Sequence, residues 1–235
     1  MSAAATDQIT YVFHLANGQA ERITLAFDPD TYLYRTDESR PAQAWTALGF
    51  KTCPHCPLDP ATEAHCPFAR ALGEFVHRFD QFYSYERSVV EVVTAQRTVV
   101  AERPLQDAMA SILGLIGATS GCPHLAFFRP MARFHLPFAS EQETLVRAFS
   151  LHLLAEYMRL GGEGEVAVTV DGLEARYRAV AAVNLAMAER VRAAFAKDAV
   201  VNAIIILDTF AQAIPFVVHQ ALKELRPLFA VTPGP

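Results

Sequence analysis

The chain has 235 residues, of which 52% are hydrophobic and 19% charged, and its formal net charge is −5. This length and composition predict a globular protein with a substantial core, built as one large domain or two small ones. Lysine and arginine form no basic block, which argues against binding to nucleic acid, because neutralising phosphates requires clustered cations.

Two β-hairpins are predicted in the first hundred residues. Asn17-Gly18 separates the β-prone runs 11–15 and 22–27. Asn-Gly favours a type I′ hairpin turn, in which both central residues need positive φ. Further β-prone runs, which predict a third short strand and a second hairpin, are 32–34, 89–93 and 97–100.

Helices are predicted for most of the remaining chain by the spacing of its apolar residues. Their approximate ranges are 68–82, 105–116, 145–160, 173–194, 198–214 and 215–229, with 166–170 as a β-prone exception. Ser140 with Glu143 and Asp171 with Glu174 have the capping-box spacing that marks helix starts. Pro215 is taken as a helix boundary, because proline disrupts a helix interior.

The order of these elements predicts an α+β fold: a small antiparallel β-sheet of two hairpins, a metal knot of four cysteines and a C-terminal helical bundle. Residues 1–103 are expected to contain the hairpins, the cysteine knuckle and one helix, and residues 104–235 the bundle. We expect both parts to form one cooperative unit.

Four cysteines are the most informative residues of the chain: Cys53, Cys56, Cys66 and Cys122. Cys53 and Cys56 have the C-x-x-C spacing that lets two thiolates reach one ion. Residues 1–8 lack an apolar signal segment and the apolar run 203–207 is too short to span a membrane, so we expect a cytoplasmic protein without membrane contact. In that compartment clustered cysteines are more often metal ligands than disulfides.

Structural zinc is the first interpretation, because a closed set of four thiolates is its typical pattern. An iron–sulfur cluster in a redox or metal sensor is the alternative, although the spacings of ferredoxins are absent. A third interpretation is a pair of free thiols that exchanges with disulfides.

The neighbours of the cysteines fit a thiolate cluster. Cys66 and Cys122 each precede a proline that is expected to open a helix, and the positive end of a helix dipole favours a thiolate. Three histidines lie beside the cysteines, either as hydrogen-bond donors to the ligands or in place of one ligand: His55, His65 and His124.

Two further sets of polar residues are candidates for ligand binding. Arg129, Arg133 and His135 crowd a proline-bracketed segment, which indicates either a small-anion site or, as we prefer, ion pairs that hold the segment in place. Polar residues on otherwise apolar helical faces, which indicate either a pocket or buried hydrogen bonds between helices, are Asn184, Asp198, Asn202 and Asp208. No nucleophile with a positioned base is recognisable, so no catalytic residue is assigned.

Several motifs together resemble a family of uncharacterised bacterial proteins. They are residues 53–58 (CPHCPL), 65–67 (HCP), 118–125 (ATSGCPHL) and 128–138 (FRPMARFHLPF). The resemblance covers nearly the whole chain and implies a bacterial source and a single unit from the first hairpin to the last helix. It implies no activity and assigns no functional residue.

Overall fold

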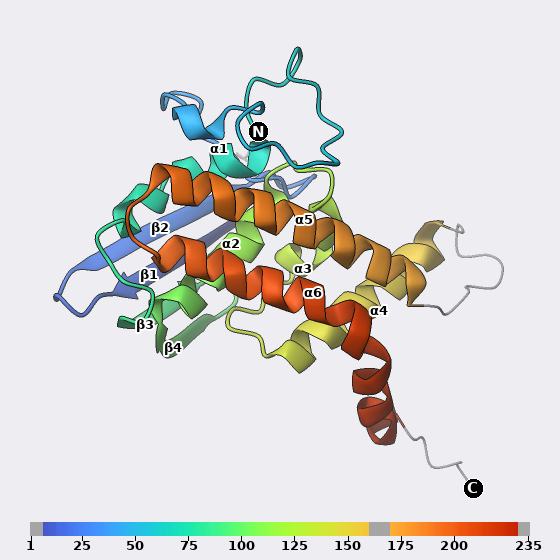
Figure 1. Ribbon diagram of the computed structural model, residues 1–235. Coiled ribbons are helices and arrows are strands. Elements are labelled where there is room, and N and C mark those ends of the chain that lie inside the picture. Colours follow the sequence, from blue (N-terminus) through green and yellow to red (C-terminus); the bar gives the residue numbers. More distant parts are fainter. Residues whose placement is uncertain (1–6, 160–169, 230–235) are drawn as a thin grey trace, which may run out of the picture.

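A computed structural model describes residues 7–159 and 170–229 (Figure 1). Its strands form one antiparallel sheet in the order β2-β1-β3-β4, with the bounds β1 Asp7–His14, β2 Ala20–Phe27, β3 Arg87–Val93 and β4 Thr98–Pro104. Both expected hairpins are therefore confirmed, and β1 joins them by pairing with β3. The β-prone run 166–170 lies outside the described residues except for its last residue.

The expected strand at 32–34 is wrong, because the chain turns there. The Asp28 carboxylate accepts the backbone N–H groups of Asp30 and Thr31 at 3.1 and 2.9 Å. Tyr32 then adopts a left-handed conformation with φ +56°. Only an isolated bridge between Phe27 and Tyr34 remains.

One face of the sheet forms part of the core. Side chains alternate between the two faces of a strand, so every second residue of β1 and β2 points inward. Tyr11 of β1 lies between its partners Ile23 of β2 and Val92 of β3. All three are buried, whereas β4 is a largely exposed edge strand.

The helices cover the buried face of the sheet in two further layers. Their bounds are α1 Pro67–Gly73, α2 Leu105–Thr119, α3 Arg129–Arg133, α4 Glu141–Arg159, α5 Asp171–Ala194 and α6 Ala199–Leu225. Short 3-10 helices are η1 Ala44–Thr46, η2 Val76–Phe79, η3 Ala126–Phe128 and η4 Arg226–Phe229. Helix α2 lies against the sheet. Helix α6 packs on the side of α2 that faces away from the sheet, and α5 lies beside α6 (Figure 1).

The expected helix over 68–82 is interrupted after its second turn. The carbonyl groups of Gly73 and Glu74 accept hydrogen bonds from Gln43 and Arg40, at 3.3 and 2.9 Å, in place of continued helical bonds. Phe75 then leaves the helical region with φ −138°. The aromatic residues of this segment are nevertheless buried. Their spacing therefore predicted correctly that they belong to the core, but it was wrong in predicting one continuous helix.

Pro215 does not separate two helices, because α6 runs through it. Proline removes one helical hydrogen bond and crowds the preceding turn, which costs about 3 kcal/mol in a helix interior. Ala211, Ile214 and Val218 are buried on either side of it. Their packing offsets this cost and keeps the helix continuous.

The continuous helical stretch Ala199–Leu228 is the one segment of the described residues that is long and apolar enough to cross a membrane. Length and composition are the only grounds, and the core helix of a soluble protein meets the same criterion. The stretch packs along α5 and α2 through its first half, while Phe216 and Leu228 near its end are exposed.

The two capping patterns differ in outcome. Ser140 Oγ accepts the N–H of Glu143 at 3.2 Å, and the Glu143 carboxylate accepts the N–H of Ser140 at 2.8 Å, which forms a complete capping box for α4. Asp171 makes no such bond at the start of α5. The Glu174 carboxylate instead pairs with Arg178 at 2.8 Å.

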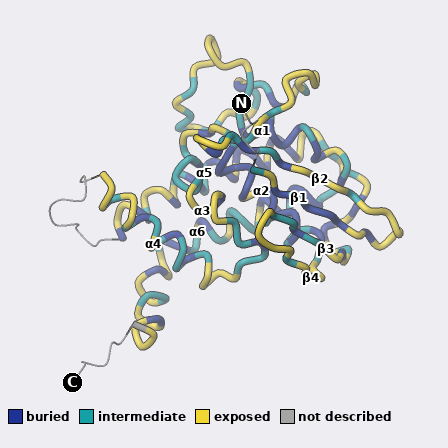
Figure 2. The backbone as a smooth tube through the Cα atoms, turned by 180° about the vertical axis from the view of Figure 1, so that it is seen from behind, coloured by how far each residue is buried: buried dark blue, intermediate teal, exposed yellow. Residues whose placement is uncertain are grey.

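A single hydrophobic cluster includes residues from the sheet, from the cysteine segment and from the C-terminal helices (Figure 2). Val90 of β3, Met109 of α2 and Ile204 of α6 are all within it. The expected boundary at residue 103 therefore does not divide the described residues into two cores.

The capping box gives the first testable prediction. Ser140→Ala removes an acceptor from the first turn of α4 and should lower the free energy of unfolding by about 1 kcal/mol. Asp171→Ala is the matched control, because Asp171 starts α5 without a capping bond. Urea unfolding of both variants measures the difference, and equal losses would contradict the assignment.

Candidate metal centre

The four cysteines lie in three segments at one end of the molecule. Cys53 and Cys56 belong to the loop between η1 and α1, which extends above α1 and α5 in Figure 1. Cys66 directly precedes α1, and Cys122 follows α2. All four are free thiols.

Backbone hydrogen bonds close the base of this loop. The N–H of Cys66 donates to the carbonyl of Thr46 at 2.8 Å, and the N–H of Leu48 donates to that of Ala64 at 3.0 Å. The two ends of the loop are thus held side by side. Because α1 starts at this closed base, Cys66 has a fixed position next to the core.

Two glycines bring Cys122 close to the same place. Gly121 has φ +92°, a left-handed conformation in which glycine avoids the strain of other residues. A Cβ atom at Gly117 would lie 3.1 Å from Leu125 and 3.3 Å from Phe68, so α2 can approach α1 only because residue 117 has no side chain. The segment after α2 therefore packs directly beside α1.

The thiols affect one another electrostatically. Burial, with smaller contributions from the thiolates of Cys66, Cys122 and Cys56, raises the pKa of Cys53 to about 12. Burial likewise raises the pKa of Cys122 to about 11. Cys53 and Cys122 are therefore both within electrostatic range of Cys56 and Cys66.

The surroundings of Cys122 favour its thiolate locally. The backbone N–H groups of His124 and Leu125 donate to the Cys122 sulfur, which lowers its pKa against the effect of burial. Cys122 opens a turn rather than the expected helix, because the N–H groups of Leu125 and Ala126 both bond to its carbonyl. The expected N–H donors are therefore present, although no helix begins there.

The thiols do not form a closed ligand set in this conformation. Within residues 7–159 and 170–229, no three His, Cys, Asp or Glu side chains are arranged to hold a metal ion. A metal ion would have to draw Cys53 and Cys56, the two more exposed cysteines, toward Cys66 and Cys122.

The three neighbouring histidines bind backbone and side-chain groups of the protein. The rings of His55 and His124 are in contact, with centroids 4.0 Å apart and planes tilted by 41°, and Nε2 of His124 donates to the His55 carbonyl at 2.9 Å. Nε2 of His55 reaches the carbonyl of Ala179 on α5 at 3.1 Å, and Nδ1 of His65 reaches Thr46 at 3.0 Å. These contacts position the loop against α5 and the segment after α2.

Arg190 of α5 is a central residue of this region that the sequence analysis missed. It is only 1% exposed, and its guanidinium donates to the carbonyls of Trp45, Ala47 and Leu48 at 2.8–3.0 Å. No carboxylate of the described residues forms an ion pair with it, and its charge lowers the pKa of Cys53. The sequence signal that could have identified Arg190 as buried is its position among Val183, Met187 and Val191 on the apolar face of α5.

The residues of the proposed small-anion cluster do not converge. Arg133 pairs with Asp7 at 3.3 Å and lies over the ring of Tyr32. Arg129 reaches the carbonyl of Thr31 at 3.5 Å, and Nε2 of His135 bonds to the Tyr11 hydroxyl at 2.5 Å. Each side chain therefore anchors the segment separately.

The four polar positions of the C-terminal helices also lie apart. Asp198 and Asn202 bond to each other at 3.0 Å and to Ser84, which ties the start of α6 to the segment before β3. Asp208 accepts a bond from Gln212 at 2.6 Å on the same helix. Asn184 alone of the four lines a large cavity.

Comparison with known proteins identifies a family but no activity. A family model described as a domain of unknown function, DUF6901, matches residues 9–230. No curated protein and no solved structure matches the chain.

Replacing Arg190 tests its structural role. Arg190→Met leaves three buried carbonyl groups without their donor and should lower the free energy of unfolding by about 3 kcal/mol or more, because each unsatisfied group costs about 1–3 kcal/mol. Arg192→Met, at an exposed position of the same helix, should change it by less than about 0.5 kcal/mol. Similar urea midpoints for the two variants would show that Arg190 is not held as described.

The raised thiol pKa values predict a loss of stability in alkali. An unfolded cysteine has a pKa of about 8.5, whereas those of Cys53 and Cys122 are about 12 and 11 in the fold. The unfolded state therefore loses its protons first, so this stabilisation is complete below about pH 8.5 and disappears as pH rises through the folded values. Unfolding of reduced, chelator-treated protein between pH 8 and 11 measures the slope.

A double variant isolates the thiol contribution to that slope. Cys53→Ser with Cys122→Ser should flatten the pH dependence between pH 8.5 and 10, below the range in which the buried tyrosines begin to contribute. An unchanged slope in this variant would mean that the thiols are accessible to water in the metal-free fold.

Proposed function

Since the chain belongs to the DUF6901 family, whose description names no activity, we propose from the geometry that this protein binds one metal ion through Cys53, Cys56, Cys66 and Cys122. Zinc is the first choice, since a set of four thiolates with no open position is its structural pattern. The ion would stabilise the fold rather than carry out a reaction.

The buried charge of Arg190 is the observation that carries this proposal. A cation away from water needs a nearby negative charge, and the described residues supply no carboxylate to it. Four thiolates around a divalent ion have a net charge of about −2. Because Arg190 already influences Cys53, such a centre would give its charge a partner.

The metal would remove an energetic penalty that burial imposes on the thiolates. Burial opposes the thiolate form of Cys53 and Cys122, whereas a bound cation stabilises it directly. Metal binding then releases protons and closes the loop over α1 and the segment after α2. In small zinc domains such binding contributes on the order of 10 kcal/mol to folding.

An iron–sulfur cluster is the alternative occupant of the same residues, and with it a role in redox or metal sensing. Both occupants require reduced thiols, which fits a cytoplasmic location. They differ in colour, since an iron–sulfur protein is brown after anaerobic purification and a zinc protein is colourless. The visible spectrum and elemental analysis of one anaerobic preparation distinguish them.

The central experiment replaces the one cysteine that lies far from the others in sequence. Anaerobically purified wild-type protein should contain one zinc per chain. Cys122→Ser should lose this zinc to a chelator and melt at a lower temperature. His124→Ala should retain it, with affinity lowered by about 10–100-fold, because His124 contacts the loop and not the ion.

A metal-free comparison separates loss of the ion from damage to the fold. After chelation, wild type and Cys122→Ser should melt at similar temperatures, because neither then has an ion to lose. Wild-type metal content and melting temperature in Cys122→Ser would instead exclude Cys122 as a ligand, and His55 and His65 would become the first residues to test. A folded wild-type protein with four free thiols and no metal would refute the proposal.

A further inference from the structure

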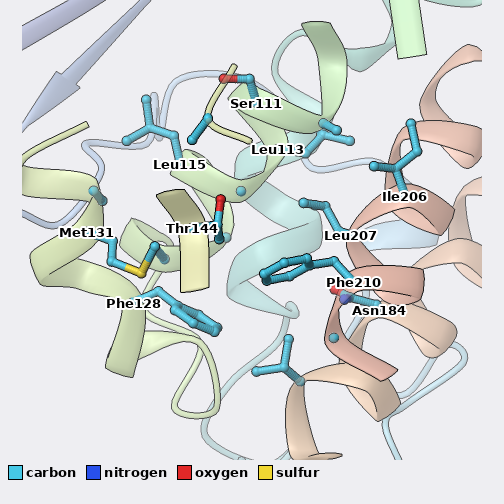
Figure 3. A pocket seen from close by; sticks show the side chains of 18 of the residues that line it. Ser111, Leu113, Leu115, Phe128, Met131, Thr144, Asn184, Ile206, Leu207 and Phe210 are labelled. Carbon is cyan, nitrogen blue, oxygen red and sulfur yellow. The ribbon is translucent and has the colours of Figure 1, made fainter. Parts of the chain in front are cut away.

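A second candidate site lies along α2. Helices α2, α3, α4, α5 and α6 line a solvent-open cavity of about 780 Å³ (Figure 3). Its wall is mainly apolar, with Leu113, Phe128, Leu207 and Phe210 among the lining side chains. This volume lies within the range of roughly 300–1,000 Å³ that is typical of small-molecule sites.

Two buried polar groups in this wall have no hydrogen-bond partner among the described residues. They are the Tyr177 hydroxyl and the Asn184 amide nitrogen, on side chains of residues that are 2% and 3% exposed. The rings of Phe128 and Phe210 flank Tyr177 at 5.3 and 5.9 Å and fix its orientation. Since native proteins pair nearly all buried polar groups, two unpaired donors in one cavity indicate an absent acceptor.

A positive charge lies near one of these donors. Arg147 of α4 is partly buried, and its Nη2 donates to the carbonyls of Met131 and Phe134 at 2.9 and 2.8 Å. Its charge acts on Tyr177 and on His135, which also line the cavity. Arg147 forms no ion pair with a carboxylate of the described residues.

The remaining titratable groups leave this charge largely uncompensated. Burial, with a smaller effect of Arg147, lowers the pKa of His135 to about 3, so His135 is neutral. Glu143 acts on Arg147 from a distance, but its carboxylate is already bonded to Ser140. The charged residues Arg103, Asp107 and Glu141 also line the cavity; Arg103 and Glu141 are exposed and Asp107 is half-buried.

We propose that this cavity binds an amphipathic carboxylate of the fatty-acid type, with its head at Arg147 and Tyr177 and its apolar chain along α2 and α6. One arginine and neutral donors match a single negative charge, and a guanidinium fork matches the two oxygens of a carboxylate. A phosphate monoester has up to two negative charges, and the other arginine of the lining, Arg103, is exposed rather than buried beside Arg147.

Ordered water would satisfy these groups less well. A buried water molecule needs two to four polar partners, and the cavity wall is mostly carbon. Tyr177 and Asn184 are seven residues apart on α5, which places their backbones about 10 Å apart along the helix axis. One water molecule cannot serve both donors. The carboxylate of the ligand would accept from Tyr177, whereas Asn184 would lie beside the apolar chain, which has no acceptor.

Binding of dodecanoate and of the uncharged dodecan-1-ol to the purified full-length chain, freed of lipid, tests this proposal. Isothermal titration calorimetry should show that dodecanoate binds at a 1:1 ratio and at least tenfold more tightly than the alcohol. Gly114→Phe should abolish binding of both ligands, because residue 114 lines the cavity next to Leu207 and a ring there would fill it.

Tyr177→Phe distinguishes a ligand contact from a structural role. It should weaken dodecanoate binding by roughly tenfold or more, because a hydrogen bond to a charged group is lost, and should leave the affinity for the alcohol unchanged. The ligand-free variant should melt at the same or a higher temperature than wild type, since the removed hydroxyl has no partner. Tyr157→Phe, at an exposed position of α4, is the matched control and should change neither property.

Three results would overturn the proposal. They are no binding of dodecanoate to wild type, equal affinity for acid and alcohol, and full carboxylate affinity in Tyr177→Phe. None of these results bears on zinc content, so this test and that of the metal centre fail independently.

Discussion

The guanidinium of Arg190 is the interaction on which the arrangement of this fold depends. Its three hydrogen bonds to the carbonyls of Trp45, Ala47 and Leu48 attach the start of the cysteine loop to α5, which follows more than a hundred residues later. A buried charge is stable only when its environment supplies many dipoles or an opposite charge. The position of the loop and the packing of α5 therefore depend on each other.

Helix α2 connects this region to the rest of the core. Its Ser111 contacts the Tyr11 hydroxyl of the sheet at 3.0 Å, and its Gly117 admits Phe68 of α1 and Leu125 beside the cysteines. Gly117 and other residues of the same helix also line the large cavity. Both candidate sites thus share α2.

The sequence predicted the elements whose signals are local. Asn17-Gly18 specifies its turn through backbone conformation, and Ser140 with Glu143 specifies a helix start through two hydrogen bonds. The helix boundaries that were predicted wrongly depend on contacts with residues distant in the sequence. Gln43 and Arg40 bond to the carbonyl groups at the end of α1, and tertiary packing keeps α6 helical across Pro215. The spacing of the cysteines is likewise a local signal, and it predicted that they lie in one region. Arg190 was missed, because its hydrogen-bond partners lie over 140 residues away in the sequence.

The buried face of α5 shows how a structural polar group differs from one that awaits a ligand. Tyr177, Asn184 and Arg190 all lie on this face and are almost fully buried. Arg190 donates to three carbonyls of the protein itself, so its hydrogen bonds are made within the fold, although no carboxylate of the described residues pairs with its charge. Tyr177 and Asn184 leave a donor unpaired beside a cavity, which the fold tolerates only at a cost in stability. Hydrogen-bond pairing thus separates Arg190, which serves the fold, from Tyr177 and Asn184, whose donors remain unpaired in the cavity wall.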